Sequence, residues 1–309
     1  MTKIKGTTVL VTGGAAGIGK LMGEECLKKG ARRLIIWDVN EQALASTSKE
    51  FKEKGYQVHA DKVDVSDPKD VESAAYTIQE DIGSVDLLIN NAGIVIGKHF
   101  NEHTHEDIRR TVDINVSGVM YVALAFLDEM LFRGKGHIVN ISSASGFTPN
   151  PKMSVYAGSK WAVLGWSESL RLEMERENTG VKVTTVTPGY IDTGMFDGVS
   201  APFLTPILTP KKIVDQIMNA VEEDEILLRS PYIVNYLPLL RGVLPTRIFD
   251  KLADAFGVYE SMSGFKGHIS KKGPEVTPAR KQVEAKAKKE DKGSEKASQK
   301  EESPEPAKA

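Results

Sequence analysis

Along the first 230 residues, short runs of apolar residues alternate with longer segments in which apolar residues recur every three or four positions. The short runs, many of them rich in β-branched residues, predict strands at 7–11, 33–37, 56–63, 85–89, 136–143, 181–187 and 226–228. The longer segments predict amphipathic helices at 18–29, 41–54, 68–82, 108–132, 154–178 and 211–223. This alternation with short connections predicts a single α/β domain over residues 1–230, with a doubly wound parallel sheet of the Rossmann type and helices on both faces.

The chain changes character after residue 230. Residues 232–258 are rich in Leu, Ile, Val and aromatic residues, but prolines, arginines and an asparagine interrupt them too often for a membrane span of ~20 apolar residues. The extension 231–269 is therefore expected either to cap a substrate cleft or to contact a membrane surface peripherally as an amphipathic segment. Residues 270–309 are mostly Lys, Glu, Ala, Ser and Pro, which predicts a disordered charged tail.

The overall composition narrows the choice of partners and compartment. A formal charge of −2 and a pI near 6.3 give no general attraction to nucleic acid. Cys26 is the only cysteine, and its place in a helical pattern predicts a small core residue rather than a disulfide partner. The N-terminus runs from a short polar lead directly into the first strand, so we expect no signal peptide or N-terminal spanning helix. These features favour an aqueous, reducing compartment such as the cytoplasm.

The first strand and helix enclose a glycine-rich loop, TGGAAGIG at 12–19. Gly13 permits a tight turn, Gly17 lets the backbone approach a pyrophosphate, and Gly19 lets the helix pack closely on the strand. The phosphates would bind at the helix N-terminus, where free N–H groups and the helix dipole favour an anion. Asp38 ends the second strand about 20 residues after the loop, where a carboxylate accepts hydrogen bonds from an adenosine ribose and repels a 2′-phosphate. This arrangement predicts NAD in preference to NADP.

Tyr156 and Lys160 form the chemical centre of the sequence. Their i to i+4 spacing in a predicted helix places both side chains on one face. A nearby ammonium favours the phenolate, so we expect Lys160 to lower the pKa of Tyr156 and to make the phenol an acid/base group. Ser143 ends the buried strand that faces this helix, and alternation along the strand points its neighbour Ser142 to the opposite side. Ser143 is therefore the candidate for holding a substrate oxygen beside Tyr156.

Two further motifs accompany these residues, NNAG at 90–93 and Asn115 within DINVSG. Together with the glycine loop and the Ser, Tyr and Lys residues, they make the chain resemble the classical short-chain dehydrogenase/reductase family over roughly residues 5–229. Within this family, the segments NNAGIVIGKHF, TGMFDG and PILTPKKIV and the apolar extension most resemble the branch of epidermal retinol dehydrogenases and lipid-droplet 17-beta-hydroxysteroid dehydrogenases.

The resemblance implies reversible hydride transfer between NAD and a hydrophobic alcohol of the retinoid, steroid or long-chain lipid type, or its carbonyl. Tyr156 would be the acid/base and Ser143 would bind the reacting oxygen, while Lys160 would hold the ribose. Asn115 would hold a water that links Lys160 to solvent. The basic residue that NADP usually needs just before the second glycine is replaced by Ala16. The cofactor-binding residues implied are Gly13, Ala16, Gly17, Ile18, Gly19, Asp38, Asp64, Val65, Asn91, Ala92, Gly93, Tyr156, Lys160, Pro188, Gly189, Ile191 and Thr193.

The resemblance also implies that the two longest helices pair across a two-fold axis in a homodimer or homotetramer. Residues 194–210, apolar and punctuated by prolines, are expected to form a lid over a small hydrophobic substrate or to pack against the core. His99, His103 and His105 are expected to be exposed loop residues rather than metal ligands, because no acidic or thiol partner stands at a recognised ligand spacing.

Two other functions are open at this point. A soluble 3-oxoacyl reductase would share the catalytic residues, but Asp38 is unfavourable because such enzymes usually use NADPH. A non-catalytic NAD-binding adaptor could act through the tail and the apolar extension. The complete Ser, Tyr, Lys and Asn set argues against the adaptor.

Overall fold

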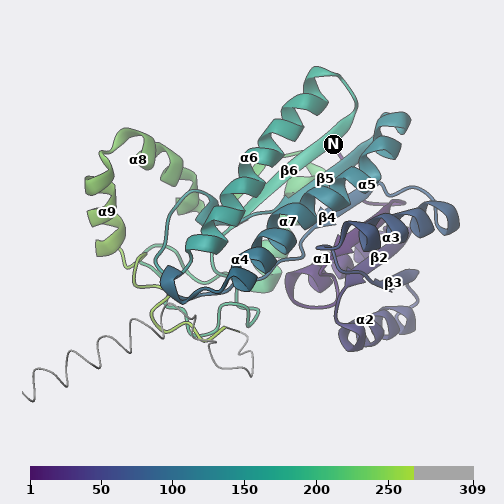
Figure 1. The fold of residues 1–309 in the computed structure, drawn as a ribbon. Coiled ribbons are helices and arrows are strands. Elements are labelled where there is room, and N and C mark those ends of the chain that lie inside the picture. The colour runs from purple at the N-terminus through teal and green to yellow at the C-terminus, as the bar shows by residue number, and fades with distance from the viewer. Residues whose placement is uncertain (268–309) are drawn as a thin grey trace, which may run out of the picture.

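A seven-stranded parallel sheet with the order β3-β2-β1-β4-β5-β6-β7 forms the centre of the molecule (Figure 1). The computed structural model describes residues 1–267. The strands are β1 Thr8–Thr12, β2 Arg33–Asp38, β3 Val58–Lys62, β4 Leu87–Asn90, β5 Gly136–Ile141, β6 Val181–Pro188 and β7 Leu227–Ser230. The predicted doubly wound sheet is confirmed, and each predicted strand is present with bounds shifted by at most two residues.

Helices cover both faces of this sheet, which explains why the strands read as nearly continuous apolar runs. One face carries α1 Gly17–Lys28, α2 Glu41–Glu53 and α7 Pro210–Glu222. The other face carries α3 Pro68–Asp81, α5 Gly118–Arg133 and α6 Ser154–Arg176. Cys26 is fully buried in the first of these two cores, as predicted.

The predicted continuous helix 108–132 is wrong in one respect, because a π-helical turn interrupts it. α4 His105–Val112 begins after Thr104, whose hydroxyl accepts the backbone N–H of Asp107 at 3.1 Å. The turn Asp113–Ser117 then joins α4 to α5. Such turns insert an extra residue and occur frequently at functional sites. This one holds Asn115, one of the predicted catalytic residues.

The stretch His105–Arg133 is the one part of residues 1–267 that is long and apolar enough to cross a membrane. The core helix of a soluble protein satisfies the same criteria of length and composition. Val122, Phe126 and Met130 lie in this stretch and are buried in the core that covers the sheet. Their packing identifies the stretch as a core helix in this fold.

The site lies where the strand order reverses. β1 pairs with β2 on one side and with β4 on the other, so the connections run outward in both directions from this point. In open α/β sheets, ligands bind beyond the carboxyl ends of the strands at such a switch point. The glycine loop leaves β1 there, Asp38 ends β2 there, and Asn90 ends β4 there.

The apolar extension forms η4 Tyr232–Tyr236 and two short helices, α8 Leu237–Val243 and α9 Thr246–Ala255, at the left of Figure 1. Its apolar residues are divided between two environments. Val234 and Phe249 are buried, whereas Leu239 and Val243 are 63% and 72% exposed. Residues 256–267 then return to the sheet domain, where Ser261 and Met262 are buried. The predicted tail 270–309 lies outside the described residues.

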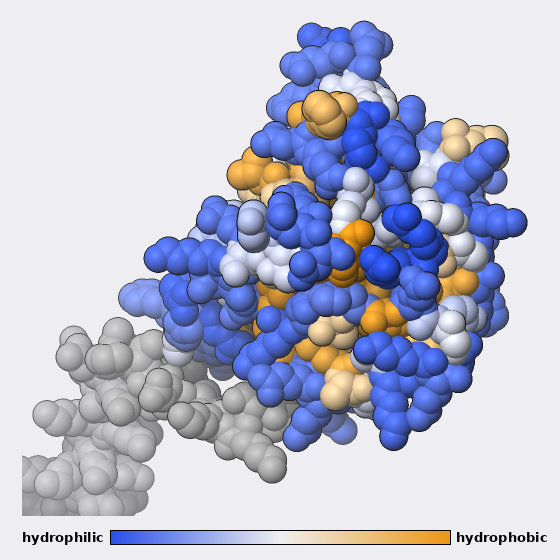
Figure 2. Space-filling model, turned by 90° about the vertical axis from the view of Figure 1, so that its right-hand side faces the viewer, coloured by the Kyte–Doolittle hydropathy of each residue, from blue (hydrophilic) through white to orange (hydrophobic). Residues whose placement is uncertain are grey.

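Figure 2 shows the side of the molecule that is on the right in Figure 1, where hydrophilic side chains predominate and apolar ones are interspersed among them. Ion pairs contribute to the hydrophilic cover of α1 and α2. Glu50 accepts from Lys20 at 2.6 Å and from Lys54 at 2.8 Å. Because surface ion pairs contribute little to stability, the apolar cores on the two faces of the sheet hold this part of the fold together.

Candidate active site

A cavity of about 400 Å³ opens at the switch point of the sheet. Of the residues predicted to form the site, only Gly19 and Asn115 do not line it. Several other lining residues were not predicted as site residues, although most of them are immediate neighbours of predicted ones. They are Trp37, Val39, Val63, Ile94, Ile114, Ile141 and Ser142, whereas Met195 and Phe196, which also line the cavity, come from the segment 194–210 that was expected to form a lid or pack against the core.

The glycine loop is shaped by contacts that exclude side chains. A Cβ atom added at Gly13, which has φ +60°, would lie 2.9 Å from the Cα of Ala92. At Gly19 it would lie 2.2 Å from the carbonyl oxygen of Gly13 and 2.5 Å from Nδ2 of Asn91. Gly17 also adopts a positive φ, +54°. The loop therefore presents bare backbone at the start of α1, as a pyrophosphate site requires, and the cavity fits a dinucleotide cofactor.

Asn91 braces the glycine loop from the end of β4. Its Nδ2 donates to the carbonyl oxygens of Thr12 and Gly13 at 3.0 and 3.1 Å. Its backbone N–H donates to the hydroxyl of Thr12 at 3.0 Å. These bonds hold the loops after β1 and β4 together, so the NNAG motif supports the glycine loop.

Tyr156 and Lys160 lie in the first turns of α6, and both side chains reach the cavity. The ammonium of Lys160 is 5.8 Å from the centre of the Tyr156 ring, and Nζ donates to the carbonyl oxygen of Ile141 at 2.9 Å. The hydroxyl of Ser143 is near enough to Tyr156 to lower the pKa of its phenol slightly, and it donates to the carbonyl oxygen of Pro188 at 3.5 Å. It also accepts the backbone N–H of Ser145 at 3.1 Å. The predicted trio thus meets at one point of the cavity wall.

Burial has the largest effect on the pKa values of Tyr156 and Lys160. It raises the pKa of Tyr156 to about 12, against a smaller lowering by the nearby hydroxyl of Ser143. Burial also lowers the pKa of Lys160 to about 8. The expectation that the tyrosine pKa is lowered is therefore wrong for this arrangement, because burial raises it and Lys160 contributes no lowering here. At neutral pH the phenol is protonated and most of the lysine is charged.

Asn115 is fully buried behind the cavity wall. Its Oδ1 accepts the backbone N–H of Ile94 at 2.8 Å, and its Nδ2 donates to the carbonyl of Ile94 at 2.9 Å and to the hydroxyl of Ser159 at 3.1 Å. A Cβ atom added at Gly93 would lie 3.2 Å from Oδ1 of Asn115 and 3.7 Å from Nζ of Lys160. Asn115 therefore joins the loop after β4 to α6, the helix that carries Tyr156 and Lys160.

Two expectations from the sequence concern the direction of the Ser142 side chain and the exposure of the histidines. The hydroxyl of Ser142 donates to the backbone oxygen of Lys160 at 2.8 Å, so it is engaged with the backbone of α6 although the residue lines the cavity. His103 is buried, with only 7% exposed, so its expected place on the surface is wrong. The reason is the short helix η1 Phe100–Glu102, which turns His103 inward, against the ring of Phe100.

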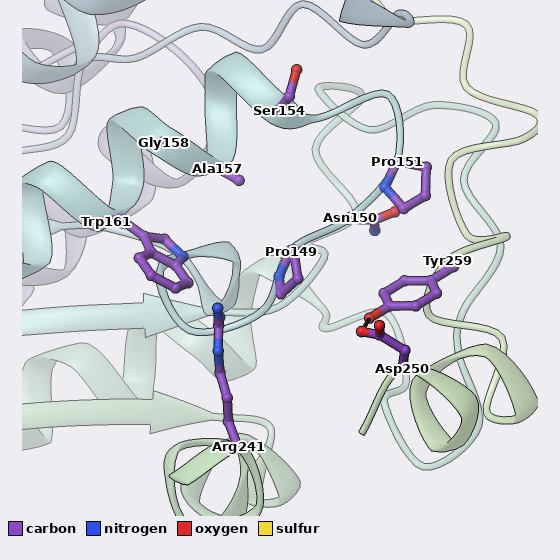
Figure 3. A pocket seen from close by; sticks show the side chains of 10 residues that line it. All are labelled: Pro149, Asn150, Pro151, Ser154, Ala157, Gly158, Trp161, Arg241, Asp250 and Tyr259. Atoms are coloured by element: carbon purple, nitrogen blue, oxygen red, sulfur yellow. Dashed lines mark hydrogen bonds between the residues drawn. The ribbon is translucent and has the colours of Figure 1, made fainter. Parts of the chain in front are cut away.

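A second hollow, of about 570 Å³, lies beside the loop 149–151 (Figure 3). It is bounded by α6, by this loop and by the extension, which contributes Arg241, Asp250 and Tyr259. The guanidinium of Arg241 lies 4.3 Å from the centre of the Trp161 ring. None of the predicted site residues lines this hollow.

Sequence comparisons point to one family. The profile described as short chain dehydrogenase matches residues 7–202. Epidermal retinol dehydrogenase 2 of Mus musculus is 35% identical over 272 residues, which cover 87% of this chain and 88% of that protein. Estradiol 17-beta-dehydrogenase 11 of Homo sapiens is 32% identical over 265 residues, covering 85% and 88%.

Solved structures agree with this result. A short chain dehydrogenase/reductase from Burkholderia phymatum in complex with NAD superposes with a TM-score of 0.73, at 25% identity, over 81% of this chain and 97% of that chain. A short-chain dehydrogenase from Sphingobium yanoikuyae in complex with NADPH gives 0.67 at 26% identity, over 85% and 98%. The chain belongs to the short chain dehydrogenase family and is an oxidoreductase that acts on CH–OH groups with a nicotinamide dinucleotide.

Proposed function

We propose that the protein is an NAD-dependent dehydrogenase that interconverts a hydrophobic alcohol and its carbonyl. The observation that carries this proposal is that the buried Tyr156 shares one cavity with Ser143, Lys160 and the carboxylate of Asp38. Steady-state assays of retinoids, steroids and long-chain alcohols, each with NAD and with NADP, test it. Turnover of no member of this panel in either direction would contradict the proposal.

The residues around the reacting oxygen have distinct parts in the reaction. Bound NAD would supply the hydride acceptor for oxidation and, as NADH, the donor for reduction. Tyr156 would accept the alcohol proton in oxidation and donate it in reduction. Its pKa of about 12 keeps the phenol protonated at neutral pH, which is the form ready to donate to a carbonyl oxygen. Ser143 would hold that same oxygen next to Tyr156.

Lys160 and Asn115 would support the proton transfer by Tyr156. An ammonium has three donors, and Lys160 gives one to the carbonyl of Ile141 at 2.9 Å. The others are available for ribose hydroxyls and for a water. We assign that water to the neighbourhood of Asn115, where it would relay the proton from Lys160 to solvent.

The preference for NAD rests on the end of β2. One oxygen of Asp38 accepts the backbone N–H of Ala15 at 3.2 Å and the other accepts that of Asn40 at 3.0 Å, so the carboxylate is held in place. Lys62, paired with Asp38 in the strand register, is engaged by Glu41 at 2.7 Å. The local charge at the ribose position is therefore unfavourable for a 2′-phosphate.

Asp38→Ala should weaken NAD binding roughly tenfold and reduce the preference for NAD over NADP by at least as much. An accepting carboxylate and a repulsive charge are lost together, and a hydrogen bond to a charged group is worth about 1.5–3 kcal/mol. The ratio of kcat/KM values for the two cofactors measures this effect. The matched control is Asp61→Ala, which removes a carboxylate from the neighbouring strand β3. A wild-type protein that prefers NADP would contradict the assignment.

The substrate side of the cavity supports a hydrophobic alcohol. Met153, Tyr156 and Met262 are buried in one apolar cluster, and Phe196 packs against it. Apolar walls with one polar anchor are typical of sites for small hydrophobic ligands. The names of the relatives, a retinol dehydrogenase and an estradiol dehydrogenase, agree with this chemistry. We therefore propose a substrate of the retinoid, steroid or long-chain lipid type.

We also propose that the protein is a homodimer or homotetramer through α5 and α6. Leu124 and Phe132 on α5 and Leu172 on α6 are exposed. Gly158 and Gly165 lie on the outer face of α6, where an added Cβ atom would meet nothing within 4 Å. Small residues on an exposed helix face let a second helix approach closely. Light scattering of the purified protein tests the oligomeric state.

The α8 and α9 hairpin supports peripheral contact of a cytoplasmic protein with a lipid surface. It exposes Leu239, Leu240, Val243 and Ile248, and Arg247 lies in α9 beside the last of these. An apolar face rimmed by cations is suited to the boundary between headgroups and acyl chains. Each buried Å² of apolar surface would contribute about 25 cal/mol.

Liposome flotation should separate the intact protein from a variant with Leu239, Leu240 and Val243 changed to Ser. We expect the intact protein to float with vesicles that contain anionic lipid and the variant to stay in the aqueous fraction. The control Tyr76→Ser, which removes an exposed aromatic side chain from α3, should float like the wild type. If neither the wild type nor the triple variant floats, the exposed residues of the hairpin have another role.

A further inference from the structure

Ser159 is a buried serine on α6 that stands between Tyr156 and Asn115 and has no part in the reaction described above. Its hydroxyl donates to the backbone carbonyl of Tyr156 at 2.6 Å. The same oxygen accepts Nδ2 of Asn115 at 3.1 Å. Ser159 therefore links the turn of α6 that carries Tyr156 to the π-turn that carries Asn115.

The chemistry of the groups fixes the direction of both bonds. A backbone carbonyl can only accept, so the single hydrogen of the Ser159 hydroxyl is used on Tyr156. The serine oxygen then has only lone pairs to offer, and these accept from the NH₂ end of an amide. Asn115 must therefore turn Nδ2 towards Ser159, and its Oδ1 faces the backbone N–H of Ile94 at 2.8 Å.

Asn115 passes this constraint on to a wall of the catalytic cavity. Its Nδ2 also donates to the carbonyl of Ile94 at 2.9 Å, so one side chain binds both backbone groups of Ile94. Gly93 and Ile94 line the cavity. A Cβ atom added at Gly93 would lie 3.7 Å from Nζ of Lys160, so this loop lies next to the lysine. The bond between Asn115 and Ser159 therefore connects the loop after β4 to the helix that carries Lys160.

We propose that Ser159 is a positioning residue, which holds Asn115, and through it the loop of Gly93 and Ile94, in a fixed place relative to the catalytic turn of α6. The proposal rests on the alcohol dehydrogenase function proposed above. Without the serine hydroxyl, one Nδ2 hydrogen of the fully buried Asn115 would lose its acceptor. An unpaired buried donor is unfavourable, so the amide would move towards another acceptor and the loop would move with it.

Ser159→Ala should lower kcat roughly tenfold or more with NAD and the best alcohol of the panel, because a misplacement of about 1 Å can cost about 100-fold in rate. The KM for the alcohol should change little. The matched control is Ser167→Ala on the same helix. Ser167 is also buried and accepts Nδ2 of Asn140 at 3.0 Å, but neither residue lines the cavity. This variant should lose stability in urea and keep its kcat. Equal losses of kcat in the two variants would overturn the positioning role.

A double-mutant cycle tests whether Ser159 acts through Asn115. If it does, Ser159→Ala in the Asn115→Ala background should lower kcat by no more than about twofold, because the effects of residues in one hydrogen-bond network do not add. A loss of kcat as large as in the wild-type background would show that Ser159 acts independently of Asn115 and would overturn the proposal.

Hydrogen exchange followed by mass spectrometry tests the position of the loop without depending on activity. The backbone N–H of Ile94 is protected by its bond to Asn115. Exchange of residues 91–97 in the full-length protein should therefore be faster in Ser159→Ala and unchanged in Ser167→Ala. Unchanged exchange in Ser159→Ala would overturn the proposal. A wild type that oxidises no alcohol of the panel would count against the proposed function and leave this measurement valid.

Discussion

Tyr156→Phe should lower kcat at least a hundredfold while leaving the affinity for NADH nearly unchanged. Positioned acid/base groups contribute about 10²–10⁴-fold to rate, and this substitution removes only the oxygen that transfers the proton. The ring stays in place, because its contacts with Phe196 and with the cluster around Met153 and Met262 do not involve the hydroxyl. Steady-state rates with the best alcohol of the panel, together with NADH titration by fluorescence, measure the two effects separately.

The two neighbouring serines provide a matched control for this result. Ser143→Ala should also reduce kcat, because Ser143 lines the cavity together with the same phenol. Ser142→Ala removes a hydroxyl of the same size that donates instead to the backbone of Lys160 at 2.8 Å. It should affect stability more than the chemical step. Full turnover in Tyr156→Phe, or equal losses of kcat in both serine variants, would contradict the assigned roles.

The fold was predictable because the pattern that builds it is local. Strands buried on both faces read as unbroken apolar runs, and helices with one buried side read as periodic ones, so their alternation defined the sheet. The π-turn at Asn115 was not predictable in this way. The apolar period continues through 108–132, and the turn is accompanied by hydrogen bonds between Asn115 and the backbone of Ile94, which lies outside that helix. Burial in the extension, for example of Val234 and Phe249, likewise depends on tertiary packing.

Site residues could be predicted where a sequence motif fixes their positions. Properties that depend on burial could not be predicted. Gly13, Asp38, Tyr156 and Lys160 follow from their spacing, and all four line the cavity. The pKa of Tyr156 shifts in the opposite direction from the prediction, because the sequence shows the nearby cation but not the loss of water. Met262 could not be assigned to the apolar cluster around Tyr156 either, because it reaches that cluster through a reversal of the chain after α9.

Gly19→Ala should lower the free energy of unfolding by about 1–3 kcal/mol and weaken NAD binding more than tenfold. Alanine is intrinsically better than glycine inside a helix by about 1 kcal/mol, so propensity alone predicts the opposite sign. At Gly19, however, the added Cβ atom would lie 2.2 Å from the carbonyl oxygen of Gly13. Overpacking of this kind costs typically 1–3 kcal/mol, and the atom displaced here is backbone of the predicted phosphate loop.

Gly242→Ala on α8 isolates the clash from the propensity. The same change is made inside a helix, but an added Cβ atom at Gly242 meets nothing within 4 Å and α8 lies outside the proposed interface of α5 and α6, so this variant should be as stable as the wild type or more stable. Urea unfolding of both variants and NAD titration measure the difference. Because Asn91 Nδ2 lies 2.5 Å from the same Cβ position, the Gly19 variant should also lose the brace between the loops after β1 and β4. Equal stability and equal NAD affinity of the two alanine variants would show that the loop can shift freely, and the close packing of α1 on the loop would then have no part in binding the cofactor.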